Sequence, residues 1–227
     1  MNKISIIVPV YNEIKYIKEV LSRLDQTNIQ NLEKEIIIVD DGSTDGTRDF
    51  LQTVEDKYKV IYHQNNLGKG GALKTGFKNV TGEIITIQDA DLEYHPRELE
   101  KLVAPILKGV ANVVYGSRMK GNNDTGYKRY YLGNWVISKT ASILYGTKLT
   151  DIETCYKVFK KEVLQNINIE SNDFGIEAEF TAKILKNKVR IAEIPIHYEP
   201  RSFLEGKKIG WKDGVQALWI LFRWRFK

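Results

Sequence analysis

The chain has 227 residues, of which 42% are hydrophobic, a composition that supports one globular domain with a buried core. Its one cysteine, Cys155, excludes an intramolecular disulfide, and no apolar stretch approaches the roughly 20 residues that span a bilayer. The net charge of +5 is carried by residues 201–227, so the rest is neutral, which argues against a nucleic-acid partner and for an anionic lipid surface.

Strand and helix patterns alternate through the first half of the chain, which predicts βαβ units and a mostly parallel, Rossmann-like α/β sheet flanked by helices. Short apolar runs predict strands at residues 4–10, 35–39, 59–62, 83–88 and 111–115. Helical spacing and capping residues predict helices at residues 14–24, 47–57, 72–79 and 96–108. The second half is less regular, with helices expected at 174–185 and 209–226 and a strand at 189–198.

The most informative motif is Asp89-Ala90-Asp91, directly after the apolar run at residues 84–87. If the chain runs straight here, side chains two residues apart point the same way, and both carboxylates can bind one cation. Oxygen ligands favour a hard ion such as Mg²⁺ or Mn²⁺, which a diphosphate would share. Taken alone, the motif fits a solvated turn equally well.

Other polar residues follow the ends of other predicted strands: Tyr11 and Glu13 after the first, Asp40 and Asp41 after the second, and Arg118 after the fifth. The first two have ordinary alternatives, a strand-to-helix turn for Tyr11 and Glu13 and a helix N-cap for Asp40 and Asp41. The loop at residues 65–71 is at most a weak candidate for a phosphate cradle, because it lacks the P-loop spacing. Since parallel strands end at one edge of a sheet, together these residues favour a single nucleotide-diphosphate site.

These motifs resemble family 2 glycosyltransferases of the GT-A fold, and among them the dolichyl- or polyprenyl-phosphate mannosyl- and glucosyltransferases. The segments that carry the resemblance extend over nearly the whole chain: Pro9 to Glu13, Asp40 to Ser43, Asn66 to Gly70, Gln88 to Asp91, Gly116 to Arg118, Asp151 to Phe159 and Glu193 to Lys208. The resemblance implies a catalytic domain at residues 1–200. Residues 201–227 would add a basic amphipathic helix to the same unit.

The resemblance also implies roles for single residues. The nucleotide sugar would be bound by Pro9, Tyr11, Glu13, Val39, Asp40, Asp41, Ala90, Arg118, Arg201 and Lys207. Asp89 and Asp91 would bind the divalent metal, with Glu93 as a third ligand where related enzymes often have Gln. Arg118, Arg201 and Lys207 would neutralise the diphosphate or the acceptor phosphate.

The expected reaction is an inverting transfer of a hexose from GDP-mannose or UDP-glucose to a polyprenyl or dolichyl phosphate. The metal and the basic residues would stabilise the leaving diphosphate. An ionised phosphate acceptor needs no strong base, whereas a saccharide hydroxyl would need one, with Asp151 and Glu153 as candidates. Their simpler interpretation is a structural turn. The rival functions are transfer to a saccharide hydroxyl, a nucleotidyltransferase, and an inactive membrane-binding module.

The C-terminal helix bears on the membrane question. On a helical wheel its large apolar residues group on one side: Trp211, Val215, Leu218, Trp219, Leu221, Phe222 and Phe226. Such a helix can lie in a membrane interface or pack on the catalytic core, and Arg225 interrupts the apolar arc. The aromatic stretch at 127–144 is a second candidate, in which Arg129 and Ser138 would bind the lipid phosphate. We therefore expect a peripheral protein on the cytoplasmic membrane face, either complete as it stands, with or without a separate membrane subunit, or part of a longer chain.

Overall fold

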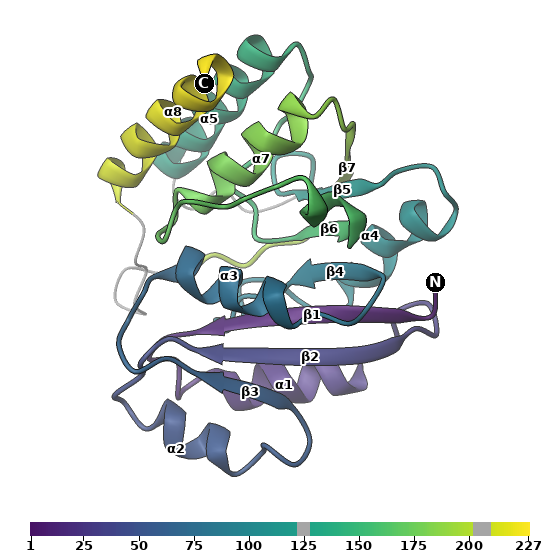
Figure 1. Cartoon of the computed structure of the whole chain (residues 1–227), viewed down its shortest axis with the longest axis vertical. Helices are drawn as coiled ribbons and strands as arrows, with labels where there is room; N and C mark the ends of the chain where they lie inside the picture. Colours follow the sequence, from purple (N-terminus) through teal and green to yellow (C-terminus); the bar gives the residue numbers. More distant parts are fainter. Residues whose placement is uncertain (122–127, 202–209) are drawn as a thin grey trace.

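A computed structural model of the chain describes residues 1–121, 128–201 and 210–227, with residues 128–130 described by backbone alone. Its centre is a seven-stranded sheet of order β3-β2-β1-β4-β6-β5-β7 (Figure 1). The strands are β1 (Lys3–Val10), β2 (Glu33–Asp40), β3 (Lys59–Tyr62), β4 (Ile84–Ile87), β5 (Val113–Ser117), β6 (Lys157–Lys160) and β7 (Ile191–Pro195). Within the described chain β6 alone runs antiparallel to its neighbours, so the predicted mostly parallel sheet is confirmed.

Six of the eight helices in the described chain occupy predicted segments, with shifted ends, whereas those at residues 128–145 and 162–165 were not predicted. The eight are α1 (Ile17–Gln26), α2 (Thr47–Gln52), α3 (Lys69–Asn79), α4 (Glu98–Leu107), α5 (Lys128–Tyr145), α6 (Glu162–Gln165), α7 (Ile176–Lys186) and α8 (Trp211–Phe226). In α1 the buried residues Ile17, Val20, Leu21 and Leu24 follow helical spacing, which gives the helix one apolar face for the core. Strand β6 was not predicted, because its four residues begin and end with lysine.

The central strands are buried on both faces, which explains their continuous apolar runs. In register, Pro9 of β1 lies beside Val39 of β2, and Val10 lies beside Asp40. Ile7 pairs with Ile87, so β4 ends at the same edge of the sheet as β1. The loop that follows each parallel strand therefore lies at the same edge of the sheet. Antiparallel β6 begins at that edge.

Helices α5, α7 and α8 lie together at one end of the molecule, beside β5, β6 and β7 (Figure 1). Helix α7 is buried from Ile176 to Ile184 because Phe180 packs on Phe159 of β6 while α5 and α8 lie against the same helix. A second apolar cluster joins the three helices through residues that include Ile137, Ala182 and Ile220. No helix in the described part of the chain is long and apolar enough to cross a membrane.

The apolar residues of α8 do not share a single surface, contrary to the helical-wheel prediction. Leu221 is fully buried beside α5 and α7, and Leu218 packs half-buried against the same cluster. The other large residues of the predicted arc, Trp211, Val215, Trp219, Phe222 and Phe226, are exposed. The Nε of Arg225 donates to the carbonyl of Leu144 at 2.7 Å, so this arginine caps the end of α5. Helix α8 thus packs on the core with one side and presents apolar residues on another.

Candidate active site

The predicted nucleoside-binding residues meet at the ends of β1 and β2. Pro9 and Tyr11 are half-buried and Val39 is fully buried. Glu13 is 8% exposed, and one of its carboxylate oxygens lies 3.0 Å from Nη1 of Arg201. The edge therefore brings together residues from the first strand and from a segment nearly 200 positions later.

Asp40 and Asp41 are both engaged by the surrounding loops. Asp40 is fully buried and accepts hydrogen bonds from Arg48 and from the backbone N–H of Ser43. Asp41 accepts from the backbone N–H groups of Leu67 and Gly68 at 2.9 and 2.8 Å. Neither residue caps α2, whose N-cap is Gly46. These carboxylates fix the two loops that follow β2 and β3, beside the expected nucleoside.

The Asp-x-Asp pair lies in a turn and not in an extended strand, because β4 ends at Ile87 and Leu92 adopts a φ of 63°. The straight chain assumed from the sequence is therefore not found. Asp89 lies 3.0 Å from Nζ of Lys69, and Asp91 lies 2.8 Å from Nη2 of Arg201. Burial and the neighbouring carboxylates Asp89 and Glu93 raise the pKa of Asp91 to about 7.

Glu93 points into the same cluster from the other side of the turn. It accepts hydrogen bonds from the hydroxyl of Tyr198 at 2.8 Å and from the backbone N–H of Arg201 at 2.8 Å. Within the described residues no three acidic, histidine or cysteine side chains form a ready-made metal site. The predicted ligand set of Asp89, Asp91 and Glu93 thus stays a prediction, and a metal bound there would share these carboxylates with their present partners.

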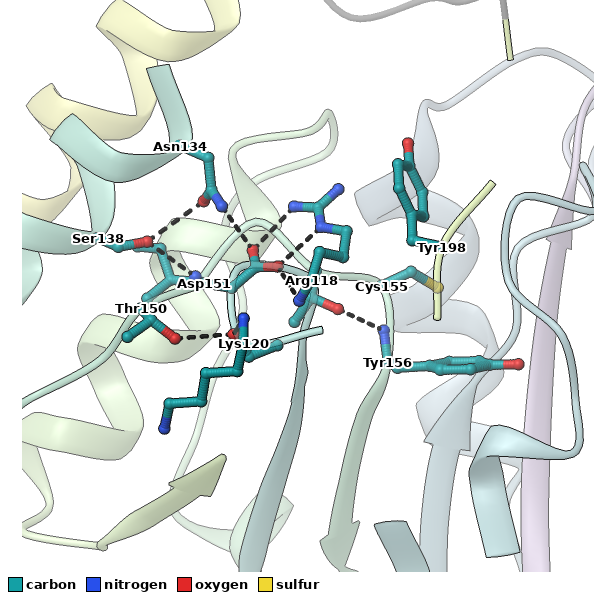
Figure 2. A network of polar contacts seen from close by, with 12 residues as sticks. Arg118, Lys120, Asn134, Ser138, Thr150, Asp151, Cys155, Tyr156 and Tyr198 are labelled. Atoms are coloured by element: carbon teal, nitrogen blue, oxygen red, sulfur yellow. Dashed lines mark hydrogen bonds and ion pairs between the residues drawn. The ribbon is translucent and has the colours of Figure 1, made fainter. Parts of the chain in front are cut away.

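Arg118 and Asp151 form a buried pair at the end of β5 (Figure 2). The Nε and Nη2 of Arg118 each donate at 2.8 Å to a different carboxylate oxygen, and the backbone N–H of Arg118 adds a third bond at 2.9 Å. Burial alone would lower the pKa of Arg118, but Asp151 outweighs it and raises that pKa well above its usual value. The guanidinium also lies over the ring of Tyr198, 5.1 Å from its centroid.

Helix α5 is tied to this pair. The side-chain amide of Asn134 donates to Asp151 at 2.9 Å, and the hydroxyl of Ser138 accepts from the backbone N–H of Ile152 at 3.1 Å (Figure 2). Ser138 is buried, so its hydroxyl supports the turn at Asp151. The side chain of Arg129 and all of Lys207 lie outside the described residues, so their predicted roles stay predictions.

A second charged cluster lies behind the Asp-x-Asp turn, between β6 and α7. Glu177 contacts Lys157, and it lies 3.0 Å from Lys69, the lysine that also contacts Asp89. Burial and the nearby Glu177 raise the pKa of Glu153 to about 7. The Oε1 of Glu153 is inaccessible to solvent and has no hydrogen-bond partner among the described residues. Near pH 7 a substantial fraction of Glu153 is therefore neutral, whereas an ordinary glutamate is almost fully ionised.

Three residues of this site were not singled out from the sequence: Lys69, Asn134 and Glu177. Lys69 belongs to a loop that was considered only as a weak phosphate cradle. The available signal was its place between Gly68 and Gly70, since paired glycines allow close backbone contact. Asn134 and Glu177 lie in helices, where the sequence does not show which face meets the site.

Comparison with known proteins assigns the chain to a family. The family model described as "Glycosyl transferase family 2" matches residues 5–167. The chain belongs to glycosyl transferase family 2. A dolichol-phosphate mannosyltransferase of Pyrococcus furiosus is 33% identical to this glycosyltransferase over 98% of the chain, which spans 64% of that relative's length. A UDP-N-acetylglucosamine–dolichyl-phosphate N-acetylglucosaminyltransferase of Methanococcus voltae is also 33% identical, over 85% of the chain and 84% of the relative.

Solved structures agree with the predicted fold. Glucosyl-3-phosphoglycerate synthase from Mycobacterium tuberculosis, in complex with Mn²⁺, UDP and glucosyl-3-phosphoglycerate, superposes with a TM-score of 0.76. The match covers 98% of this glycosyltransferase and 80% of the synthase, at 19% identity. A second structure of that synthase, with Mg²⁺ and UDP, gives a TM-score of 0.75. At this identity the likeness concerns the fold, and it confirms the GT-A prediction.

Proposed function

We propose that this family 2 glycosyltransferase is an inverting, metal-dependent enzyme. It transfers a hexose from a nucleotide sugar, GDP-mannose or UDP-glucose, to a polyprenyl or dolichyl phosphate at a membrane surface. The observation that carries the proposal is the double role of α5. This helix exposes large apolar residues, and it hydrogen-bonds through Asn134 to Asp151, the partner of Arg118. The apolar surface of α5 and Arg118, the cation proposed to bind phosphate, are thus linked through Asp151.

The donor half of the site is supported by the arrangement of the strand ends. Pro9, Tyr11 and Val39 line the edge next to Asp40 and Asp41, where a nucleoside of the donor would bind. Ala90 lies between the two aspartates and is 4% exposed. Arg201 and Lys207 would neutralise the diphosphate, and Arg201 already lies among the carboxylates of the site.

The charges of this cluster suit a divalent cation. Glu13, Asp91 and Glu93 all contact Arg201, so among the described residues three carboxylates face one guanidinium. Two negative charges remain if all three are ionised, and the raised pKa of Asp91 reflects that crowding. Carboxylate oxygens are the ligands that Mg²⁺ and Mn²⁺ prefer. When bound, the ion would stabilise negative charge on the departing nucleoside diphosphate.

The acceptor half follows from Arg118 and α5. A lipid phosphate is ionised at neutral pH, so it can attack the anomeric carbon without a strong base. Arg118 would neutralise that phosphate or the diphosphate, and Asp151 would hold the guanidinium in place. Arg129, near the start of α5, is proposed as a second contact for the acceptor phosphate. Attack from the side opposite the diphosphate inverts the configuration of the sugar.

The surface of α5 and α8 supports a membrane-bound acceptor. Of the thirteen large hydrophobic residues exposed in the described chain, nine belong to these two helices. They are Leu132, Trp135, Val136, Ile143, Trp211, Val215, Trp219, Phe222 and Phe226. Concentrated exposed apolar residues, with tryptophans among them, are typical of helices that lie at a membrane interface. We therefore propose a peripheral protein on the cytoplasmic membrane face.

A saccharide hydroxyl remains a second candidate acceptor, because one observation favours it. The raised pKa of Glu153, about 7, would suit a general base. Asp151 is a poor candidate for that role because its oxygens are occupied by Arg118 and Asn134. Glu153→Gln therefore separates the two functions. The phosphate-acceptor enzyme keeps its rate in this variant, whereas a hydroxyl-acceptor enzyme that relies on Glu153 loses about 100-fold or more.

The function is tested by supplying UDP- and GDP-sugars with Mn²⁺, first in a thermal-shift panel and then in a transfer assay with a radiolabelled donor. Vesicles containing a polyprenyl phosphate compete with a soluble oligosaccharide as acceptors. We expect label in an organic-extractable, acid-labile lipid product together with release of a nucleoside diphosphate. Label only in the oligosaccharide, or release of pyrophosphate, would contradict the proposal.

A further inference from the structure

Lys69 is a largely enclosed cation to which the reaction as proposed gives no role. It is the first residue of α3, and its side chain is 14% exposed. Its Nζ lies 3.0 Å from Oδ1 of Asp89 and 3.0 Å from Oε1 of Glu177. Burial alone would lower the pKa of Lys69, but attraction to these two carboxylates raises it well above its usual value. Two carboxylates from separate parts of the fold thus hold one ammonium at the back of the donor site.

The backbone around Lys69 is fixed by close packing against the segment before α7. A Cβ on Gly68 would lie 2.4 Å from the carbonyl oxygen of Asn172, and one on Gly70 would lie 2.5 Å from that of Ser171. Gly68 also has a φ of +83°, and the N–H of Gly71 donates to Asn172 at 3.0 Å. The two glycines allow this contact, which places the lysine between the end of β4 and the first turn of α7.

Each aspartate of the pair has its own protein cation. Lys69 contacts Asp89, and Arg201 contacts Asp91 at 2.8 Å. A divalent cation bound by both aspartates must compete with both contacts, because like charges at such distances repel strongly. Lys69 keeps Glu177 as a partner when it leaves Asp89, so its charge stays compensated.

We propose that Lys69 is an exchangeable cation of the donor site. It holds Asp89 before the metal binds, and it contacts the diphosphate of the donor once the divalent ion has taken Asp89. The inference rests on the metal-dependent donor site proposed above. It has a thermodynamic consequence: the metal frees Lys69 for the diphosphate, so binding of the metal and binding of the nucleotide reinforce each other.

The test uses titration calorimetry on the whole chain. Mn²⁺ is titrated alone and in the presence of UDP or GDP, whichever the thermal-shift panel selects. The neutral variants Lys69→Met and Lys69→Gln remove the competing charge, and Lys69→Arg is the charge-retaining control. We expect the neutral variants to bind Mn²⁺ alone about tenfold more tightly, because less repulsion opposes it. The factor by which nucleotide tightens Mn²⁺ binding falls about tenfold in them, and Lys69→Arg stays close to wild type.

The outcomes separate the proposed metal-dependent function from the proposed exchange of Lys69. If the wild type binds no Mn²⁺ with or without nucleotide, the metal-dependent function is wrong. If the wild type binds Mn²⁺ but the neutral variants match it, or bind more weakly, Lys69 has only a structural role and the exchange is refuted. Circular dichroism checks that each variant folds. If neither neutral variant folds, a wild-type crystal structure with Mn²⁺ and the nucleoside diphosphate decides. An intact Lys69–Asp89 contact, with no contact from Lys69 to the diphosphate, overturns the inference.

Discussion

Asp151→Asn separates a positioning carboxylate from a catalytic base. The substitution keeps the shape of the side chain but removes the charge that holds Arg118 through three hydrogen bonds of 2.8 to 2.9 Å. Removing one partner of a buried ion pair costs about 3–5 kcal/mol, because the other charge stays buried without compensation. Asparagine retains some hydrogen bonding, so we expect the free energy of unfolding to fall by about 3 kcal/mol. For a chain of this size the Tm then falls by about 6–12 °C.

Urea denaturation measures this change, and the surface pair of Glu19 and Arg23 provides a matched control. Their side chains meet at 2.7 Å on α1, one turn apart and exposed, so Glu19→Gln should change stability by less than about 0.5 kcal/mol. A loss of that small size for Asp151→Asn as well would refute the assignment of a buried, stabilising pair.

The rate of sugar transfer tests whether Asp151 acts by positioning Arg118. If Asp151 acts through Arg118, then Asp151→Asn costs little further activity once Arg118→Met is present, because the group it positions is already gone. If Asp151 were a general base, its loss would reduce the rate by a similar factor in the wild type and in Arg118→Met. Independent, multiplicative losses of rate in the double variant would therefore contradict the positioning role.

Three further predictions concern the charge, the surface and the backbone of the site. Because the pKa of Glu153 is raised from 4.5 to about 7 on folding, stability should fall by about 3 kcal/mol as the pH rises between these two values and level off above them. Glu153→Gln should remove that pH dependence from urea unfolding. Trp219→Gln, at a side chain that is 67% exposed, should leave stability within about 0.5 kcal/mol of wild type, yet lower binding to anionic vesicles in a sedimentation assay. Gly70→Ala should destabilise by about 1–3 kcal/mol through its clash with Ser171, whereas Gly133→Ala, with open space around it in α5, should be neutral or stabilising in thermal denaturation.

The outline of the site follows from the sequence because parallel strands share a direction. Each apolar run of the first half ends in a polar residue, and the fold brings Glu13, Asp41, Asp89 and Arg118 to one edge without further information. The position of that edge depends on periodicity alone, which is a local property. The site could therefore be located before any contact between its residues was known.

The partners of those residues could not be predicted in the same way. Lys69, Arg201 and Asn134 reach their carboxylates through contacts between segments far apart in the chain, and periodicity does not show which loops pack together. Strand β6, which brings Lys157 to the site and runs antiparallel to its neighbours, was also missed. In α8 a helical wheel groups apolar residues but does not show which of them the protein buries, so it did not separate buried Leu221 from the exposed residues grouped with it.

The most direct test of the proposed metal-dependent transfer is the Asp91→Ala variant. Transfer from the nucleotide sugar to polyprenyl phosphate is measured over a range of Mn²⁺ concentrations, with the exposed residue Asp56, changed to Ala, as the matched control. We predict that Asp91→Ala loses about 100-fold or more of the transfer rate and no longer responds to Mn²⁺, because a charge stabiliser of the leaving group is lost. The control should behave as wild type. An Asp91→Ala enzyme with unchanged rate and unchanged Mn²⁺ dependence would contradict the assignment of this edge as the donor site.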